Sequence, residues 1–143
     1  MTSITLEPAL GRDWPAEPLF HLDQLWIQVA GSRCNLTCTH CFVSCGPEAD
    51  RHDLMSRAEV ARRVTEALPL GVREFYFTGG EPFLHRDLIE ILADTLAHGP
   101  CTVLTNGTLF TERLAAELAG LSARSPASLE IRISLDGYRA RDH

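Results

Sequence analysis

The stretch Glu74-Phe-Tyr-Phe-Thr-Gly-Gly-Glu-Pro82 carries the pattern that decides the fold. Its first five residues, 74–78, are rich in aromatic side chains and predict a strand, and the glycine pair and proline predict a turn. A helix should follow this turn, because four aliphatic side chains fall on one helical stripe before Gly99. These side chains are Leu88, Ile91, Leu92 and Leu96. The stretch therefore begins one strand–turn–helix unit of an α/β fold.

The same unit is predicted on both sides of this stretch. Upstream, residues 25–30 are expected to form a buried strand, and a helix should begin at Ser56, whose spacing to Glu59 fits a capping box. Downstream, residues 101–105 predict a third strand, and Thr111 is placed to cap a third helix.

Apolar and polar residues alternate along the fourth predicted strand, residues 129–135. Its apolar side chains would pack on helices, whereas its polar side chains suit a lumen or ligand site better than a dry core. The polar residues in and just after this strand are Glu130, Arg132, Ser134 and Asp136. The order β-α-β-α-β-α-β implies parallel strands joined by right-handed crossovers. The sequence thus predicts an α/β domain with its ligand edge at the carboxyl ends of the strands.

Composition and charge limit the classes of protein to which this chain can belong. The 143 residues, 45% of them hydrophobic, suffice for one globular domain or a piece of a larger one. The net charge of −6 argues against a nucleic-acid-binding surface. Apolar runs are all shorter than the roughly 20 residues that span a bilayer, and the proline-interrupted residues 1–22 are expected to be an irregular leader rather than a signal peptide. We therefore expect a cytoplasmic protein with reduced thiols that binds neither membranes nor nucleic acid.

Three cysteines lie close together after the first predicted strand. Cys34, Cys38 and Cys41 have the spacing C-x3-C-x2-C on one loop. Four-iron clusters ordinarily take four thiolate ligands, so a loop that supplies three can leave one iron without a protein ligand. An open metal position is a reactive one. The alternative is a structural zinc site completed by Cys45 or His40, although zinc loops usually carry paired C-x2-C knuckles.

This spacing, with its surroundings, resembles the signature of the radical S-adenosylmethionine superfamily, and in particular its sulfatase-maturase-like, peptide- and cofactor-maturing branch. The resemblance covers about residues 25–137. Besides the cysteines, it includes a ring on each side of Cys41, a turn like the family's methionine-binding motif, and two later strand ends. The matching residues are His40, Phe42, Thr78–Pro82, Thr105–Gly107 and Ser134–Gly137.

The resemblance implies an enzyme with two cofactors, a [4Fe–4S] cluster and S-adenosylmethionine. Cys34, Cys38 and Cys41 would hold the cluster, and S-adenosylmethionine would chelate its open iron. One electron from a flavodoxin- or ferredoxin-like donor would break the S–C5′ bond, and the resulting 5′-deoxyadenosyl radical would abstract hydrogen from a peptide or small-molecule substrate. The residues expected to contact S-adenosylmethionine or to shield the cluster are Gly79, Gly80, Glu81, Pro82, Asn106, Ser134, Asp136, His40 and Phe42.

The methionine-binding turn has a simpler alternative. Gly79 and Gly80 would let the backbone approach the methionine moiety, and Glu81 would accept a hydrogen bond from its ammonium group. An ordinary strand-to-helix turn would use the same residues. Likewise, Asn106 and Asp136 could be turn formers before glycine rather than ribose ligands.

The remaining loop residues are also open to two interpretations. His40 and Phe42 would shield the cluster or contact the adenine, or they would simply pack within the loop. Arg132 would meet a carboxylate in the lumen or be a solvated edge residue. Cys45 is best interpreted as an ordinary loop cysteine, and Cys101, inside a strand, as a small core residue.

By the resemblance, the fold is an incomplete (β/α)6 partial TIM-like barrel. Residues 23–143 are expected to be the N-terminal portion of the core domain, truncated after the fourth strand. That strand would then be an unpaired edge. We favour truncation, and the alternative to an active enzyme is then a truncated, non-catalytic remnant that still binds the iron–sulfur cluster and S-adenosylmethionine. Alternatively, the chain is one half of a split enzyme, or it associates with a second copy that covers the edge.

Overall fold

The structure, a computed structural model, describes residues 20–139. Most of the predicted irregular leader, residues 1–22, lies outside the described residues, and residues 20–22 carry no regular structure. None of the helices in the described range is long and apolar enough to cross a bilayer.

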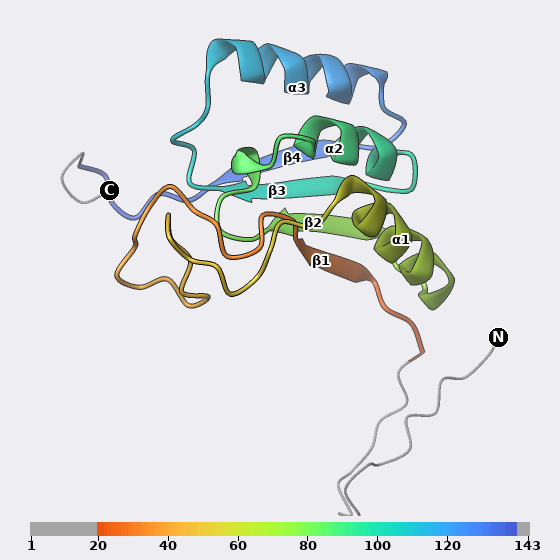
Figure 1. The fold of residues 1–143 in the computed structure, drawn as a ribbon. Coiled ribbons are helices and arrows are strands. Elements are labelled where there is room, and N and C mark those ends of the chain that lie inside the picture. The colour runs from red at the N-terminus through yellow and green to blue at the C-terminus, as the bar shows by residue number, and fades with distance from the viewer. Residues whose placement is uncertain (1–19, 140–143) are drawn as a thin grey trace, which may run out of the picture.

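Four parallel strands form one sheet in the order β1-β2-β3-β4 (Figure 1). The bounds of the strands are Gln24–Gln28 for β1, Glu74–Thr78 for β2, Cys101–Thr105 for β3 and Leu129–Ile133 for β4. The predicted bounds of β2 and β3 are confirmed. The α/β class and the parallel order are confirmed as well.

The first and last strands end two residues earlier than the sequence predicts. After β1 the chain turns, because the Gly31 N–H donates to the Gln28 carbonyl at 3.0 Å and Gly31 has a φ of 55°. At β4, the last paired residue is Ile133, which lies opposite Thr105 at the end of β3. One further backbone bond, from Ser134 N to Thr105 O at 2.9 Å, extends the pairing, but β3 offers no partner beyond it.

Three helices lie on the same face of the sheet (Figure 1). They are α1, Arg57–Ala67, α2, Leu88–Leu96, and α3, Glu112–Arg124, with the short 3-10 helices η1, Leu68–Leu70, and η2, Pro82–Leu84. The predicted caps are confirmed, since Ser56 accepts from the Glu59 N–H and Thr111 accepts from the Leu114 N–H, both at 3.2 Å.

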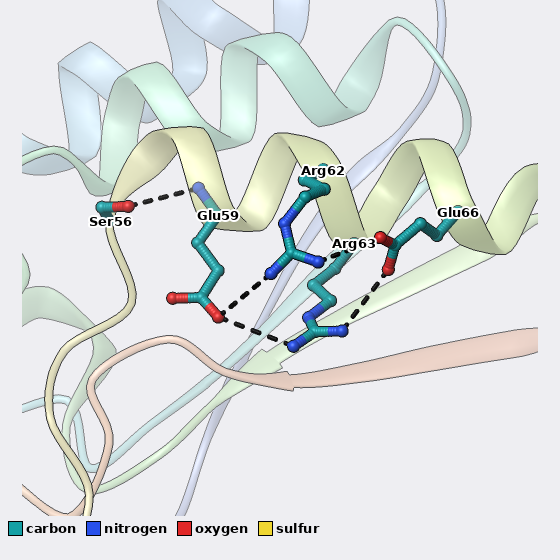
Figure 2. A network of polar contacts seen from close by, with 5 residues as sticks. All are labelled: Ser56, Glu59, Arg62, Arg63 and Glu66. Carbon is teal, nitrogen blue, oxygen red and sulfur yellow. Dashed lines mark hydrogen bonds and ion pairs between the residues drawn. The ribbon is translucent and has the colours of Figure 1, made fainter.

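The exposed side of α1 carries a network of charged residues (Figure 2). The Glu59 carboxylate lies 3.6 Å from Arg62 and 3.7 Å from Arg63, and Glu66 lies 2.9 Å and 3.4 Å from the same two arginines. Pairs at i,i+3 and i,i+4 of an exposed helix contribute only a few tenths of a kcal/mol each, roughly 0.3–0.5. This network therefore adds little to the stability of α1, and packing of the opposite side, through Val60, Val64 and Ala67, holds the helix in place.

The core lies between the sheet and the helices. Phe75, Phe77 and Val103 of the central strands are fully buried, and they pack with α2 residues such as Leu92 and Leu96. The buried stripe predicted for α2 is confirmed in full, since Leu88, Ile91, Leu92 and Leu96 are all buried. Cys101 is 1% exposed within this core, as predicted.

The opposite face of the sheet is aromatic and polar. Trp26 of β1 stacks on Tyr76 of β2 with ring centroids 4.5 Å apart, and the Arg132 guanidinium lies 5.7 Å from the Tyr76 ring centroid. Arg132 also donates to Glu130 at 2.9 Å, and Glu130 accepts from Thr102 at 3.2 Å. The side chains of Glu130 and Arg132 thus meet polar and aromatic neighbours on the helix-free face of the sheet.

Candidate functional site

The turns that follow β1 and β2 are bonded to each other at the carboxyl edge of the sheet. The Gly80 N–H donates to the Gly31 carbonyl at 3.0 Å, and the Glu81 N–H donates to the Arg33 carbonyl at 2.8 Å. A Cβ on Gly80 would lie 1.8 Å from the Arg33 oxygen, so only glycine permits this approach. Gly79 has a φ of 134°, which also favours glycine. The glycine pair therefore holds the start of the cysteine loop against β2.

The carboxylate of Glu81 is fully buried and committed to protein donors. One oxygen accepts from the Phe83 N–H at 3.0 Å and from the Thr105 hydroxyl at 2.7 Å. The other oxygen accepts from the Asn106 N–H at 2.9 Å. Three donors compensate the loss of water around a buried carboxylate. The structure therefore places Glu81 as a link between the turn after β2 and the end of β3.

The three cysteines of the motif lie on the loop after β1. Cys38 is exposed, and Cys34 and Cys41 are half-buried. Backbone N–H groups point at two of the sulfurs, from Leu36 to Cys34 Sγ at 3.5 Å and from Cys45 to Cys41 Sγ at 3.4 Å. Such N–H···S bonds stabilise the thiolate form that binds metals.

The surroundings of Cys41 and Cys38 shift the pKa values of their thiols in opposite directions. The backbone N–H of Cys45 is the main cause that lowers the pKa of Cys41 below the ordinary value of a thiol. Desolvation, followed by the charges of Asp136, Cys34 and Cys41, raises the pKa of Cys38. Asp136 and the two other motif cysteines therefore lie close enough to Cys38 to act on its thiol.

Cys45 and Cys101, the two cysteines outside the motif, have raised pKa values. Burial, followed by the neighbouring Cys41, raises the pKa of Cys45. Burial alone raises the pKa of Cys101 to about 12, so this thiol is inert in the folded core. Cys45 is half-buried and its thiol contacts the Val43 carbonyl at 3.9 Å.

Two predicted site residues meet beside the cysteine loop. His40 Nε2 lies 3.3 Å from Asp136 Oδ1, and both side chains are exposed to solvent, at 67% and 43%. Asp136 also influences Cys38, so the segment after β4 reaches the cysteine loop. Phe42, by contrast, is 96% exposed and neither packs in the loop nor covers the cysteines. Ser134 is exposed, with its backbone paired to β3.

The structure brings in residues that the sequence did not indicate. Asn35 and Thr108 hydrogen-bond with the side chain of Asn106. Their only sequence signals are an amide next to Cys34 and a hydroxyl just after an Asn-Gly pair, and both are common in ordinary loops.

A buried histidine fixes the exit of the cysteine loop. His85 is 6% exposed, and its Nε2 lies 2.7 Å from the Met55 carbonyl while its Nδ1 accepts from the Asp87 N–H at 3.1 Å. These partners assign the neutral ring with the proton on Nε2. A pocket of about 580 Å³ lies here, lined by residues 53–56, residues 84–87 and Arg33.

The donor set of the loop fits an iron–sulfur cluster. It consists of three thiols on one loop, and two of their sulfurs accept backbone N–H bonds. Within residues 20–139, the structure shows no group of three or more His, Cys, Asp or Glu side chains that could hold a single metal ion. Cys34, Cys38 and Cys41 would hold the cluster.

Comparison with known proteins gives one family. The family model described as "Radical SAM superfamily" matches residues 29–139. A probable GTP 3′,8-cyclase of Methanopyrus kandleri is 39% identical over 104 residues, which cover 73% of this chain and 31% of that protein. The GTP 3′,8-cyclase of Paenarthrobacter nicotinovorans is 36% identical over 110 residues, covering 73% and 29%. The chain thus spans about a third of the length of these relatives.

Solved structures support the same fold. The crystal structure of BtrN in complex with AdoMet and 2-DOIA has a TM-score of 0.54 at 24% identity and covers 69% of this chain and 42% of that chain. At that identity the similarity shows the parallel α/β fold alone. Radical SAM enzymes use a [4Fe–4S] cluster and S-adenosylmethionine, which are the two cofactors that the family resemblance implied. Because the family model matches most of the sequence, the chain belongs to the radical SAM superfamily.

Proposed function

We propose that this chain binds a [4Fe–4S] cluster through Cys34, Cys38 and Cys41 and contributes to the reductive cleavage of S-adenosylmethionine. When bound, the cluster supplies one electron to the sulfonium, which gives methionine and a 5′-deoxyadenosyl radical that takes a hydrogen atom from the substrate. The observation that carries the proposal is the convergence of the cysteine loop, the Gly-Gly-Glu-Pro turn and the end of β3 at one edge of the sheet.

The residues at this edge have defined tasks in the proposal. The Cys45 backbone N–H lowers the pKa of Cys41 and so favours the thiolate form in which this residue would ligate the cluster. The turn at residues 79–82 presents its backbone to the methionine moiety and is kept in place by the buried Glu81 carboxylate. Because that carboxylate is already committed, we assign ammonium binding to the backbone of the turn.

The adenosine end would lie toward the last strand. Ser134 and Asp136 extend from the end of β4 at the same edge, and Asp136 lies beside His40 and the cysteine loop. Hydroxyl and carboxylate groups there are suited to the ribose hydroxyls, and the His40 ring to the adenine. Phe42, exposed above this loop, would be covered only by a bound ligand or partner.

The substrate and the electron donor are proposed at the level of chemical class. We propose a small-molecule substrate rather than a peptide, because the relatives that match this chain are named GTP 3′,8-cyclases. The electron donor would be a flavodoxin- or ferredoxin-like protein, and the compartment the cytoplasm. Residues 23–143 would form the N-terminal portion of the core domain, and a further polypeptide strand would cover β4.

Anaerobic reconstitution with iron and sulfide tests the proposal. We expect brown protein with broad absorbance near 400 nm, lost in Cys38→Ala and retained in Cys45→Ala. Stoichiometric zinc without a chromophore would overturn the assignment in favour of the structural zinc site. Formation of 5′-deoxyadenosine under a strong reductant then separates an active chain from a remnant that only binds the cofactors.

A further inference from the structure

We propose that Asn106 is a positioning residue for Cys34 and that its side-chain amide makes the reduction potential of the bound cluster less negative. The inference rests on the proposed function, because it needs Cys34 to be a cluster ligand. It assigns to Asn106 a contact with the cysteine loop rather than with the ribose.

The amide of Asn106 points at the sulfur of Cys34. Asn106 Nδ2 lies 3.8 Å from Cys34 Sγ, within the range of an N–H···S hydrogen bond. The second N–H of the same amide donates to Asn35 Oδ1 at 2.9 Å. Asn106 therefore bonds both the ligand residue and its chain neighbour, although 72 and 71 residues separate them from it in sequence.

Three side chains form a closed ring of hydrogen bonds. Asn35 Nδ2 donates to Thr108 Oγ1 at 2.8 Å, and Thr108 Oγ1 donates to Asn106 Oδ1 at 2.6 Å. Asn106 Nδ2 closes the ring by donating to Asn35 Oδ1. Each hydrogen bond in such a chain polarises the next, so the ring is more stable than three separate contacts.

The ring also fixes which end of the Asn106 amide faces the sulfur. Asn106 Oδ1 accepts from the Thr108 N–H at 2.9 Å as well as from the Thr108 hydroxyl. A rotated amide would bring its N–H₂ group against that backbone N–H, and its oxygen against the Asn35 oxygen and the Cys34 sulfur. The donor end is therefore held toward Cys34.

The backbone of Asn106 is fixed independently. Its N–H donates to the buried Glu81 carboxylate at 2.9 Å, and the preceding Thr105 hydroxyl donates to the same carboxylate. The amide thus extends from an anchored strand end and does not drift with the loop.

A donor aimed at a ligand sulfur has a known electronic effect. Hydrogen bonds to the sulfurs of iron–sulfur clusters are among the factors that set the reduction potential. The bond is stronger when the cluster is reduced, because more negative charge then lies on sulfur. Loss of the Asn106 donor should therefore make the potential more negative.

The test is a redox titration of reconstituted protein without S-adenosylmethionine, followed by electron paramagnetic resonance. Asn106→Leu removes both donors at similar size and should shift the midpoint potential to a more negative value. Asn106→Asp adds a negative charge at the same place and should shift it further in the same direction. Thr108→Ser keeps the hydroxyl of the ring and should titrate like the wild type.

The outcomes separate this inference from the proposed function. Wild-type protein that takes up no iron and sulfide overturns both. Equal potentials for wild type and Asn106→Leu at equal iron content overturn only the inference. If circular dichroism shows that Asn106→Leu does not fold, Thr108→Val is compared with the wild type instead, because it removes one of the two Thr108 donors that orient the amide. A folded variant that retains less iron per chain than Thr108→Ser supports the positioning of Cys34 by Asn106.

Discussion

The Glu81 carboxylate accepts a hydrogen bond from the Asn106 backbone N–H at 2.9 Å, across 25 residues of sequence. This bond joins the turn after β2 to the end of β3. The N–H of Glu81 donates to Arg33 at the start of the cysteine loop, so one residue connects three strand ends. The edge that holds the expected cofactor site is therefore assembled by the protein's own bonds.

Glu81→Gln should destabilise the fold. The amide replaces one acceptor oxygen by an N–H₂ group, so it cannot accept from Phe83, Thr105 and Asn106 together. A buried donor left without a partner costs about 1–3 kcal/mol, and the free energy of unfolding measured with urea should fall by that amount. Glu48→Gln, on the exposed part of the loop, is the control and should leave it unchanged. Equal stabilities would contradict the linking role of Glu81.

Gly80→Ala should disturb the cysteine loop. The new methyl group would lie 1.8 Å from the Arg33 carbonyl oxygen, and backbone cannot yield as a flexible side chain does. Overpacking typically costs about 1–3 kcal/mol, measured as loss of unfolding free energy. Gly46→Ala is a matched control in the same loop, because a Cβ there meets no atom within 4 Å. Similar losses for both variants would show that the close approach at Gly80 is unimportant.

As the pH rises, the thiols of the cluster-free protein should become reactive toward iodoacetamide in a defined order. Cys41 has a lowered pKa, whereas the pKa values of Cys38 and Cys45 are raised and that of Cys101 is about 12. Because the thiolate is the nucleophile, iodoacetamide should modify Cys41 at lower pH than Cys38 or Cys45. Mass spectrometry of a pH series measures the midpoints of Cys41, Cys38 and Cys45. Cys101 should react only after unfolding, and its labelling in native protein would contradict its place in the core.

Asp94→Asn should weaken the contact between α1 and α2 in a pH-dependent way. Arg57 donates to both oxygens of Asp94, at 2.6 Å and 2.8 Å, and this bond lowers the pKa of the carboxyl group despite some burial. A lowered pKa contributes stability above the unfolded-state pKa, near 4, and that contribution disappears as the pH falls through the native pKa.

Urea unfolding at several pH values measures this effect. Wild type should be more stable than Asp94→Asn at neutral pH, by a small margin because the pair is exposed, and equal to it in acid. For Asp50→Asn, in the exposed loop, the difference in stability from the wild type should not shrink in acid in this way. A difference that persists below the native pKa would contradict the role of the ion pair.

The outer side of β4 should promote association. A groove of about 320 Å³ lies between α3 and β4, lined in part by Leu118 and Ile131, and Ile133 at its end is 57% exposed. Such apolar surface beside an open strand edge favours contact with another chain. Light scattering should show a concentration-dependent rise in mass that Ile133→Asp reduces. Leu22→Asp, 38% exposed before β1, is the control, and an equal effect there would point to non-specific aggregation.

Local patterns in the sequence determined the elements and their order. The bounds of β2 and β3, the caps Ser56 and Thr111 and the buried stripe of α2 follow from periodicity and capping chemistry, which act over a few residues. The spacing of Cys34, Cys38 and Cys41 indicated the family, since all three ligands lie on one short loop.

Only the tertiary structure decided the partners of the polar side chains. The sequence indicated Glu81 and Asn106 as cofactor contacts, whereas the folded chain pairs the Glu81 carboxylate with Thr105 and Asn106, and the Asn106 amide with Asn35 and Cys34. It also placed Thr108 against Asn35 across 73 residues. Such bonds depend on the register of neighbouring strands and on the approach of separate turns, which no local pattern contains.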